Sequence, residues 1–216
     1  KDLLVVSATA SGKTFIGEMA GLKNFLEKRG RVLFLVPLVA LAYQKYERFQ
    51  QKYGHLTEVS IITGASRIQV KDSKRPANRN KNAGILVATY EGIDHLMRIG
   101  ECLPGIGTVI IDEVQMLEDR DRGHRVDGLI ARMKYTSPKA QFLYLSATIG
   151  HPKLLAQKLG CRLVRYDDRP VSLERYLIFS EREQKIPTER TLVAEEYNHV
   201  STKGYHGQTI IFTNSR

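Results

Sequence analysis

Short apolar runs bounded by turn residues recur along the chain, separated by longer mixed segments. Most of these runs are continuously apolar rather than alternating, which is typical of parallel strands covered on both faces. Strands are therefore predicted at residues 3–8, 32–37, 59–64, 84–89, 108–113, 141–148 and 208–214. The segments between them predict helices at residues 13–29, 41–52, 90–99, 123–134, 152–159 and 188–202.

This alternation of strand and helix predicts a doubly wound α/β fold with a mostly parallel sheet. In such folds ligands bind beyond the carboxyl ends of the strands. The alternation pauses after about Val164, where proline and charged residues gather. We therefore expect one ligand-binding domain over 1–164, a connector over 165–187, and the first helix and strand of a second α/β unit over 188–216.

Composition narrows the function classes. The formal net charge of +10 favours a polyanionic partner, although a basic but ordinary surface explains it equally well. The densest basic stretch, residues 67–81, also contains proline and asparagines and is typical of a solvated loop. No apolar run reaches the roughly 20 residues of a membrane-spanning helix. Cys102 and Cys161 are far apart, which predicts reduced thiols in an intracellular protein rather than a zinc site or a disulfide.

A phosphate-binding loop is predicted directly after the first strand, in SATASGKT at residues 7–14. The pattern GxxxxGK[ST] is met at its last three positions, while Ser7 replaces the first glycine. Small residues let backbone N–H groups turn toward phosphate oxygens at a helix N-terminus. An incidental small-residue turn is the alternative. The predicted nucleotide-binding residues are Ala8, Thr9, Ala10, Ser11, Gly12, Lys13 and Thr14, with Lys13 on the terminal phosphates and the Thr14 hydroxyl on Mg²⁺.

Two carboxylates, Asp112 and Glu113, follow the apolar strand TVII. Two acids at the end of a buried strand suit a bound cation, although a solvated strand end can also carry them. With a phosphate loop upstream, Asp112 is the expected Mg²⁺ holder and Glu113 the group that deprotonates an attacking water. ATP and Mg²⁺ are thus the predicted cofactors, and Lys13, Asp112 and Glu113 the predicted catalytic residues.

These segments together resemble a superfamily II helicase, specifically the superkiller-like group that is related to archaeal DNA-repair and RNA-exosome helicases. ATASGKT (8–14) resembles motif I, VPLVALAYQ (36–44) motif Ia, VATYEGIDHLMR (87–98) motif Ib, DEVQ (112–115) motif II, LSATIG (145–150) motif III and IIFTNSR (210–216) motif IV. Arg122–Gly123 and RPVSLE (169–174) resemble flanking phrases of the same group. The resemblance implies a RecA-like P-loop NTPase fold.

The resemblance also implies roles for residues outside the nucleotide site. Eight residues are expected to contact a nucleic-acid strand, mainly at phosphate and sugar: Pro37, Leu38, Ala40, Thr63, Gly64, Thr89, Tyr90 and Glu91. Four are expected to couple the nucleotide to that strand: Gln115, Ser146, Ala147 and Thr148. As bare sequence, Pro37–Leu38 also suits a common strand-to-helix turn, and Ser-Ala-Thr a helix cap.

The function implied is an ATP-dependent helicase or translocase, a monomeric intracellular motor acting on single-stranded or forked DNA or RNA, as in DNA repair. A non-catalytic nucleic-acid-binding scaffold and a P-loop NTPase outside the helicases are the alternatives. The family's arginines that reach the γ-phosphate belong to later motifs, which have no counterpart in these residues. Because such arginines contribute about 10³–10⁵ in rate, we expect these residues alone to bind Mg-nucleotide weakly, hydrolyse it poorly and not unwind.

Overall fold

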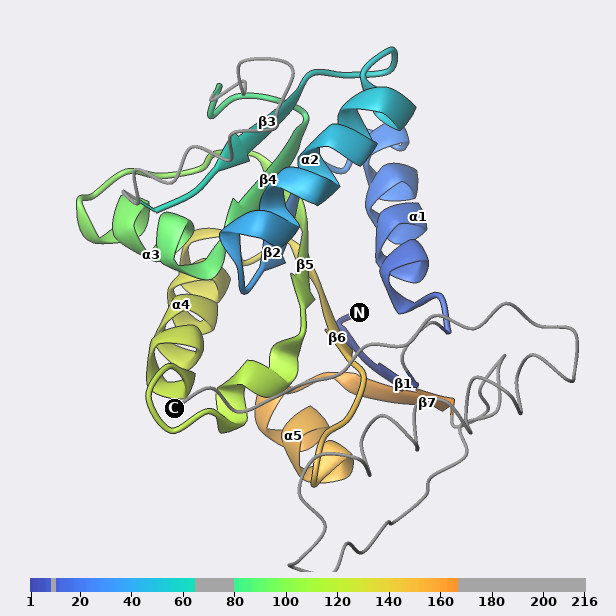
Figure 1. The fold of residues 1–216 in the computed structure, drawn as a ribbon, viewed down its shortest axis with the longest axis vertical. Coiled ribbons are helices and arrows are strands. Elements are labelled where there is room, and N and C mark those ends of the chain that lie inside the picture. Colours follow the sequence, from blue (N-terminus) through green and yellow to red (C-terminus); the bar gives the residue numbers. More distant parts are fainter. Residues whose placement is uncertain (9–10, 65–79, 167–216) are drawn as a thin grey trace, which may run out of the picture. The chain divides into compact units, whose positions relative to one another are not determined.

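A computed structural model describes residues 1–8, 11–64 and 80–166 (Figure 1). All of these residues belong to one compact unit, Lys1–Ser172. The predicted helix at 188–202, the predicted strand at 208–214, and nearly all of the predicted connector lie outside the described residues. The division into domains therefore stays a prediction.

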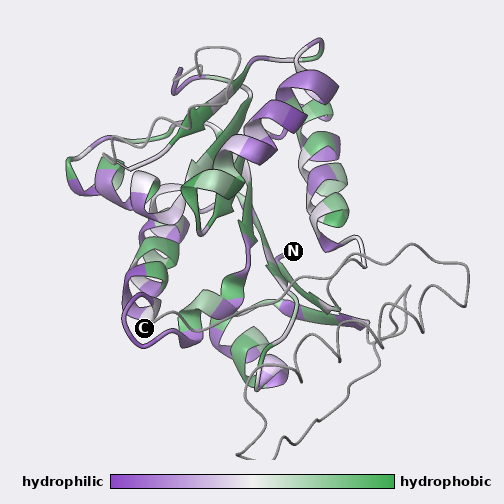
Figure 2. Cartoon of the chain, in the orientation of Figure 1, coloured by the Kyte–Doolittle hydropathy of each residue, from purple (hydrophilic) through white to green (hydrophobic). Residues whose placement is uncertain are grey.

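Seven strands of the described part form one sheet in the order β3-β4-β2-β5-β6-β1-β7, and every neighbouring pair is parallel. This confirms the predicted doubly wound α/β class. Figure 2 shows the strands as mostly hydrophobic along their length, as expected where helices cover both faces. The strands are β1 Leu3–Ser7, β2 Arg31–Val36, β3 Val59–Ile62, β4 Ile85–Thr89, β5 Ile106–Asp112, β6 Gln141–Ser146 and β7 Arg162–Tyr166.

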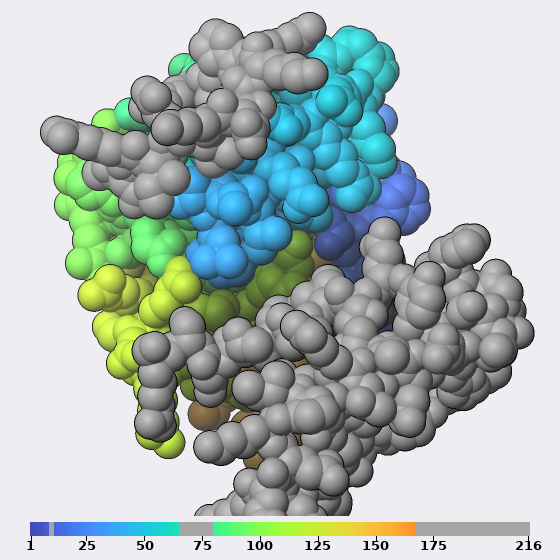
Figure 3. Space-filling view, in the orientation of Figure 1, coloured from blue at the N-terminus to red at the C-terminus, as the bar shows by residue number. Residues whose placement is uncertain are grey.

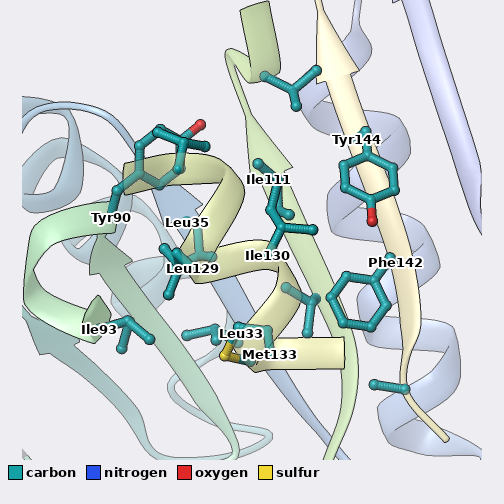
Figure 4. Close-up of a cluster of buried hydrophobic side chains, with 14 of the residues drawn as sticks. Leu33, Leu35, Tyr90, Ile93, Ile111, Leu129, Ile130, Met133, Phe142 and Tyr144 are labelled. Atoms are coloured by element: carbon teal, nitrogen blue, oxygen red, sulfur yellow. The ribbon is translucent and has the colours of Figure 1, made fainter. Parts of the chain in front are cut away.

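Helices cover both faces of the sheet. On one face, α1 (Lys13–Leu26) and α2 (Val39–Tyr53) pack over a core that includes Phe34 and Ile110. On the other face, α3 (Tyr90–Arg98), α4 (Gly123–Thr136) and α5 (Pro152–Leu159) pack over a second core (Figure 4). A short 3₁₀ helix, η1 (Val114–Glu118), follows β5 directly. The helices on the two faces bury nearly all residues of β1 to β6.

Among the differences from the sequence-based expectation, those at β7 and at the end of α1 are larger than a shift of one or two residues at the end of a predicted element. Strand β7 was not predicted, and it is an edge strand whose RLVRY side chains are mostly exposed. Helix α1 ends at Leu26 rather than residue 29, because the chain turns through positive φ at Lys28 (56°) and Gly30 (123°). Neither difference disturbs the strands that carry the candidate site.

The parallel register brings the ends of five strands to one edge of the sheet. Thr89 at the end of β4 pairs with Val36 of β2, and Asp112 of β5 pairs with Leu145 of β6. Val6 of β1 pairs with Ser146 of β6. Segments that are more than 100 residues apart in sequence therefore meet at this carboxyl edge.

Candidate functional site

The predicted nucleotide loop follows β1 at the carboxyl edge. Gly12 precedes α1 with φ 90°, and a Cβ added there would meet no atom within 4 Å. Lys13 is buried, and its Nζ donates hydrogen bonds to the carbonyl oxygens of Ser7 at 2.6 Å and Ala8 at 2.8 Å. The side chain of Lys13 thus points back along the loop that it follows. Thr9 and Ala10 lie outside the described residues.

The loop is closed on itself by a short polar contact. Ser7 Oγ donates to Ser11 Oγ at 2.5 Å, so the serine that replaces the first motif glycine joins the two ends of the loop. The N-terminus of the 14-residue helix α1 lies directly behind it. Such an N-terminus favours an anion, because its first N–H groups have no partner within the helix.

The acidic end of β5 lies across from this loop. Asp112 is buried, and Thr14 Oγ1 donates to its Oδ2 at 3.5 Å. Glu113 has φ 61° and ψ 46°, a left-handed conformation that costs a non-glycine residue about 1–3 kcal/mol. The turn is followed at once by Val114, which is fully buried and anchors η1. The strained residue is therefore the one predicted to act as general base.

Burial and the charged groups around Asp112 shift its pKa in opposite directions. Burial raises the pKa of Asp112, and Glu113 adds to that rise, while Lys45 and Lys13 oppose it. Lys45 extends from α2 with its Nζ 5.4 Å from the centroid of the Phe34 ring. Burial lowers the pKa of Lys45, and the charges of Asp112, Glu18 and Glu113 oppose that fall. Sequence analysis did not identify Lys45, since a lysine on an amphipathic helix carries no distinguishing signal.

Asp112→Asn should raise the melting temperature in the absence of nucleotide and metal. A carboxyl whose pKa is raised on folding destabilises the folded state when ionised, so stability falls as the pH rises through the raised pKa. The variant should melt about 2–6 °C higher at pH 7.5, given about 2–4 °C per kcal/mol in a domain of this size. Thermal melts in EDTA test this, and the gain should shrink as the pH falls toward the ordinary value of 3.8.

The exposed Asp127 of α4 offers the matched control, because Asp127→Asn removes the same charge from a solvated position. Its melting temperature should stay within about 1–2 °C of the unmodified protein, because surface substitutions usually change stability by no more than about 0.5 kcal/mol. An equal rise in both variants would mean that overall charge, rather than the burial of Asp112, controls stability.

A hydrogen-bonded chain links the acidic residues to the end of β6. Gln115 Nε2 donates to Glu113 Oε2, and Ser146 Oγ donates to Gln115 Oε1 at 2.8 Å. Ser146 is fully buried, and its hydroxyl also approaches the carbonyl oxygen of Thr148 at 3.1 Å. Ser146 thus connects the Ser-Ala-Thr segment to the acidic motif through Gln115. The coupling role of Gln115, Ser146, Ala147 and Thr148 stays a prediction.

The residues predicted to contact a strand gather beside the nucleotide residues, at the ends of β2, β3 and β4. Leu38 and Ala40 are exposed at the start of α2, while Pro37 is buried. Gly64, which follows Thr63, lies beside Glu91, since a Cβ added to Gly64 would be 3.7 Å from the Glu91 Cβ. Thr89 Oγ1 accepts a hydrogen bond from Gly92 N and caps α3.

Tyr90 departs from the expected surface position. Its side chain is buried in the core shown in Figure 4, and its hydroxyl donates to the carbonyl oxygen of Asp112. Burial raises the pKa of Tyr90 well above its ordinary value, and the charges of Asp112 and Glu113 raise it further. The side chain therefore supports the acidic strand end through this hydrogen bond.

The donor set fits Mg²⁺ with a nucleotide. Mg²⁺ is usually held by one or two protein oxygens together with phosphates and waters, which matches the Thr14 hydroxyl and the Asp112 carboxylate. Among the described residues no group of three His, Cys, Asp or Glu side chains could hold a metal without such help. Every helix within these ranges is too short or too polar to span a bilayer.

Comparisons with known proteins agree with this geometry. The sequence model for the DEAD/DEAH box helicase family matches residues 1–155. The chain is 48% identical over 217 residues to the probable ATP-dependent helicase MJ1401 of Methanocaldococcus jannaschii, covering 100% of this chain and 26% of that protein. It is 34% identical over 226 residues to the ATP-dependent DNA helicase Hel308 of Pyrobaculum calidifontis, covering 100% of this chain and 30% of that protein.

A solved structure supports the fold. The DUF1998 helicase MrfA superposes with a TM-score of 0.68 at 23% identity, covering 100% of this chain and 34% of that chain. The chain spans about a quarter to a third of the length of these relatives. The family match decides against a P-loop NTPase outside the helicases and confirms the superfamily II resemblance seen in the motifs.

Proposed function

The chain belongs to the DEAD/DEAH box helicase family, and on that premise we propose that it is the ATP-binding part of an ATP-dependent helicase or translocase. The observation that carries this proposal is the meeting of four side chains at one sheet edge. Lys13 and Thr14 start α1, Asp112 ends β5 and Glu113 follows it, and a hydrogen bond between Thr14 and Asp112 joins the two pairs. A scaffold protein has no need of all four.

ATP binding is assigned to the loop after β1. Backbone N–H groups of residues 8–14 and the N-terminus of α1 would surround the phosphates, and Lys13 would place its ammonium on the terminal ones. In this structure the carbonyl oxygens of Ser7 and Ala8 accept hydrogen bonds from Lys13 Nζ. Lys13 would exchange these acceptors for phosphate oxygens when the nucleotide binds. The nucleotide must therefore compete with two existing hydrogen bonds.

Hydrolysis is assigned to Glu113. Its carboxylate, held by the amide of Gln115, would orient a water and accept its proton as the water attacks the γ-phosphate. Thr14 and Asp112 would hold Mg²⁺, which neutralises charge that develops on the phosphates. The bond between Gln115 and Ser146 would transmit the state of this centre to the end of β6.

Nucleic-acid binding is assigned to the neighbouring strand ends. Leu38, Ala40, Thr63, Gly64 and Glu91 follow the carboxyl ends of β2, β3 and β4, and Gly64 lies beside Glu91. Contacts there would be to the backbone of a single strand, which positions the strand without reading its sequence. The similarity to a probable ATP-dependent helicase and to an ATP-dependent DNA helicase supports this assignment. We propose a monomeric motor with an intracellular location, where ATP is available.

Phosphate release measured with malachite green tests the function in the complete protein that carries these residues. Turnover should depend on Mg²⁺ and rise when single-stranded DNA or RNA oligonucleotides are added. Lys13→Met serves as the control for contaminating ATPases, since it removes the ammonium that binds phosphate. Bound ATP without turnover under every condition would support the scaffold alternative instead.

A further inference from the structure

Arg122, at the start of α4, joins two segments of the carboxyl edge that are far apart in sequence. Its Nη2 donates to the carbonyl oxygen of Pro37 at 2.9 Å and also contacts Glu91 Oε1. Pro37 precedes α2, and Glu91 lies in the first turn of α3. One guanidinium therefore holds the starts of both helices that border the expected strand track.

The backbone of Arg122 is fixed to the segment that follows the acidic residues. Asp119 Oδ1 accepts from the N–H groups of Asp121 at 3.0 Å and Arg122 at 2.8 Å. Asp119 itself follows η1, and its N–H donates to the carbonyl oxygen of Met116 at 3.2 Å. The guanidinium is thus connected through one short, hydrogen-bonded turn to the end of β5.

A second connection runs beside the first. Tyr90 precedes Glu91, and its buried hydroxyl donates to the carbonyl oxygen of Asp112. The segment 90–91 is therefore held to the acidic strand end by Tyr90 and to the turn after η1 by Arg122. Two attachments on adjacent residues leave little freedom for the start of α3 to move independently of the nucleotide site.

The ion pair between Arg122 and Glu91 is too exposed to add much to the stability of the fold. The side chains of Arg122 and Glu91 are 33% and 46% exposed, and pairs of this kind contribute about 0–1 kcal/mol. The pair does, however, fix the positions of two segments, because the same Nη2 also reaches a main-chain carbonyl. Figure 3 shows the surfaces of α2, α3 and α4 meeting on one face.

We propose that Arg122 is a positioning residue, which holds the Pro37 carbonyl and the Glu91 carboxylate in a fixed relation to the end of β5. The two strand-contacting segments would then respond together to the nucleotide. The expected effect on nucleic-acid stimulation rests on the proposed function. The clamp, meaning the contacts of Arg122 with Pro37 and Glu91, is a property of this chain itself. The hydrogen bonds of the Arg122 guanidinium within the described residues go to Pro37 and Glu91 rather than to the predicted nucleotide-binding and catalytic residues, so its loss should leave basal hydrolysis intact.

Arg122→Gln tests the consequence in the complete protein that carries the chain. Basal ATPase should stay within about twofold, while the oligonucleotide concentration giving half-maximal stimulation should rise about tenfold, within the usual range of coupling between sites. Arg125→Gln is the matched control, because Arg125 lines the same pocket as Arg122 and carries the same charge. The double variant Arg122→Gln/Glu91→Gln should be no more impaired than Arg122→Gln alone.

Equal effects of Arg122→Gln and Arg125→Gln would overturn the inference, because bulk positive charge would then explain both. A direct contact between Arg122 and a nucleic-acid phosphate would overturn it too. Such a contact would make the salt-dependence slope of nucleic-acid binding smaller by about one in Arg122→Gln, and Glu91→Gln would bind the nucleic acid more tightly.

Hydrogen exchange of the chain, without nucleotide or nucleic acid, tests the clamp independently of activity. Arg122→Gln should accelerate exchange in residues 38–42 and 90–93 together, while Arg125→Gln should leave both unchanged. Acceleration in neither segment, or in only one, would contradict a clamp that joins them. If the unmodified protein shows no nucleic-acid stimulation, the proposed function fails, and the exchange result still decides the clamp.

Discussion

Glu113→Gln should lower ATP turnover by about 10²- to 10⁴-fold and leave nucleotide affinity within about threefold, the loss expected for a general base. Glutamine keeps the size of the side chain and can still accept the hydrogen bond from Gln115 Nε2, but it cannot take a proton from water. The left-handed backbone at this position is retained, since both residues have the same branching. The change therefore isolates proton transfer from folding and binding.

Two measurements on the complete protein separate these effects. Phosphate release gives turnover, and the fluorescence of a labelled ATP analogue gives affinity. Glu118→Gln is the matched control, because Glu118 ends the same 3₁₀ helix at an exposed position and should keep full activity. Undiminished turnover in Glu113→Gln would assign water activation to another group. Loss of affinity along with turnover would show that Glu113 also shapes the binding site.

The fold was predictable because most strands are buried on both faces. The runs at β2 and β5 are continuously apolar, and the helices between such runs leave few topologies open. Strand β7 escaped prediction because it lacks this signal: its RLVRY sequence has only two consecutive aliphatic residues between arginines and is mostly exposed at the edge of the sheet. An edge strand is specified by its neighbour β1 more than by its own hydropathy.

The candidate site was predictable only where one short segment carries the chemistry. SATASGKT and DEVQ each place their functional residues within a single strand end, so sequence order alone brings them to the carboxyl edge. Contacts across segments were not predictable. The hydroxyl of Tyr90 reaches Asp112, and the guanidinium of Arg122 reaches Pro37, through the packing of α3 and α4 that no local pattern encodes.

The largest expected effect on stability comes from a close backbone approach at the start of β5. Arg31 of β2 pairs with Ile106, and Val32 pairs with Thr108, so Gly107 is an extra residue in a bulge. A Cβ on Gly107 would lie 2.1 Å from the carbonyl oxygen of Arg29 and 2.8 Å from the Cα of Gly30. These atoms belong to the main chain, so no side-chain rotation can relieve the overlap.

Gly107→Ala should therefore lower the free energy of unfolding by about 3 kcal/mol or more, at the upper end of overpacking effects. The reduced entropy of the unfolded chain acts in the opposite direction but contributes only about 0.4–1 kcal/mol. Urea unfolding should show this loss, and the melting temperature should fall by roughly 6–12 °C. Gly128→Ala in α4 is the matched control.

The three atoms nearest to a Cβ on Gly128 would all belong to the guanidinium of Arg132, the nearest at 3.3 Å, and they lie at the far end of a flexible side chain rather than in the main chain. Because alanine favours a helix interior over glycine by about 1 kcal/mol, Gly128→Ala should be neutral or stabilising. Equal stability of the two variants would contradict this prediction. It would mean that the turn between α1 and β2 moves to accommodate the new Cβ of Gly107→Ala at no free-energy cost. That turn also contacts the start of the strand that ends at Asp112, so a displaced turn should appear as weaker Mg-ADP binding in Gly107→Ala alone.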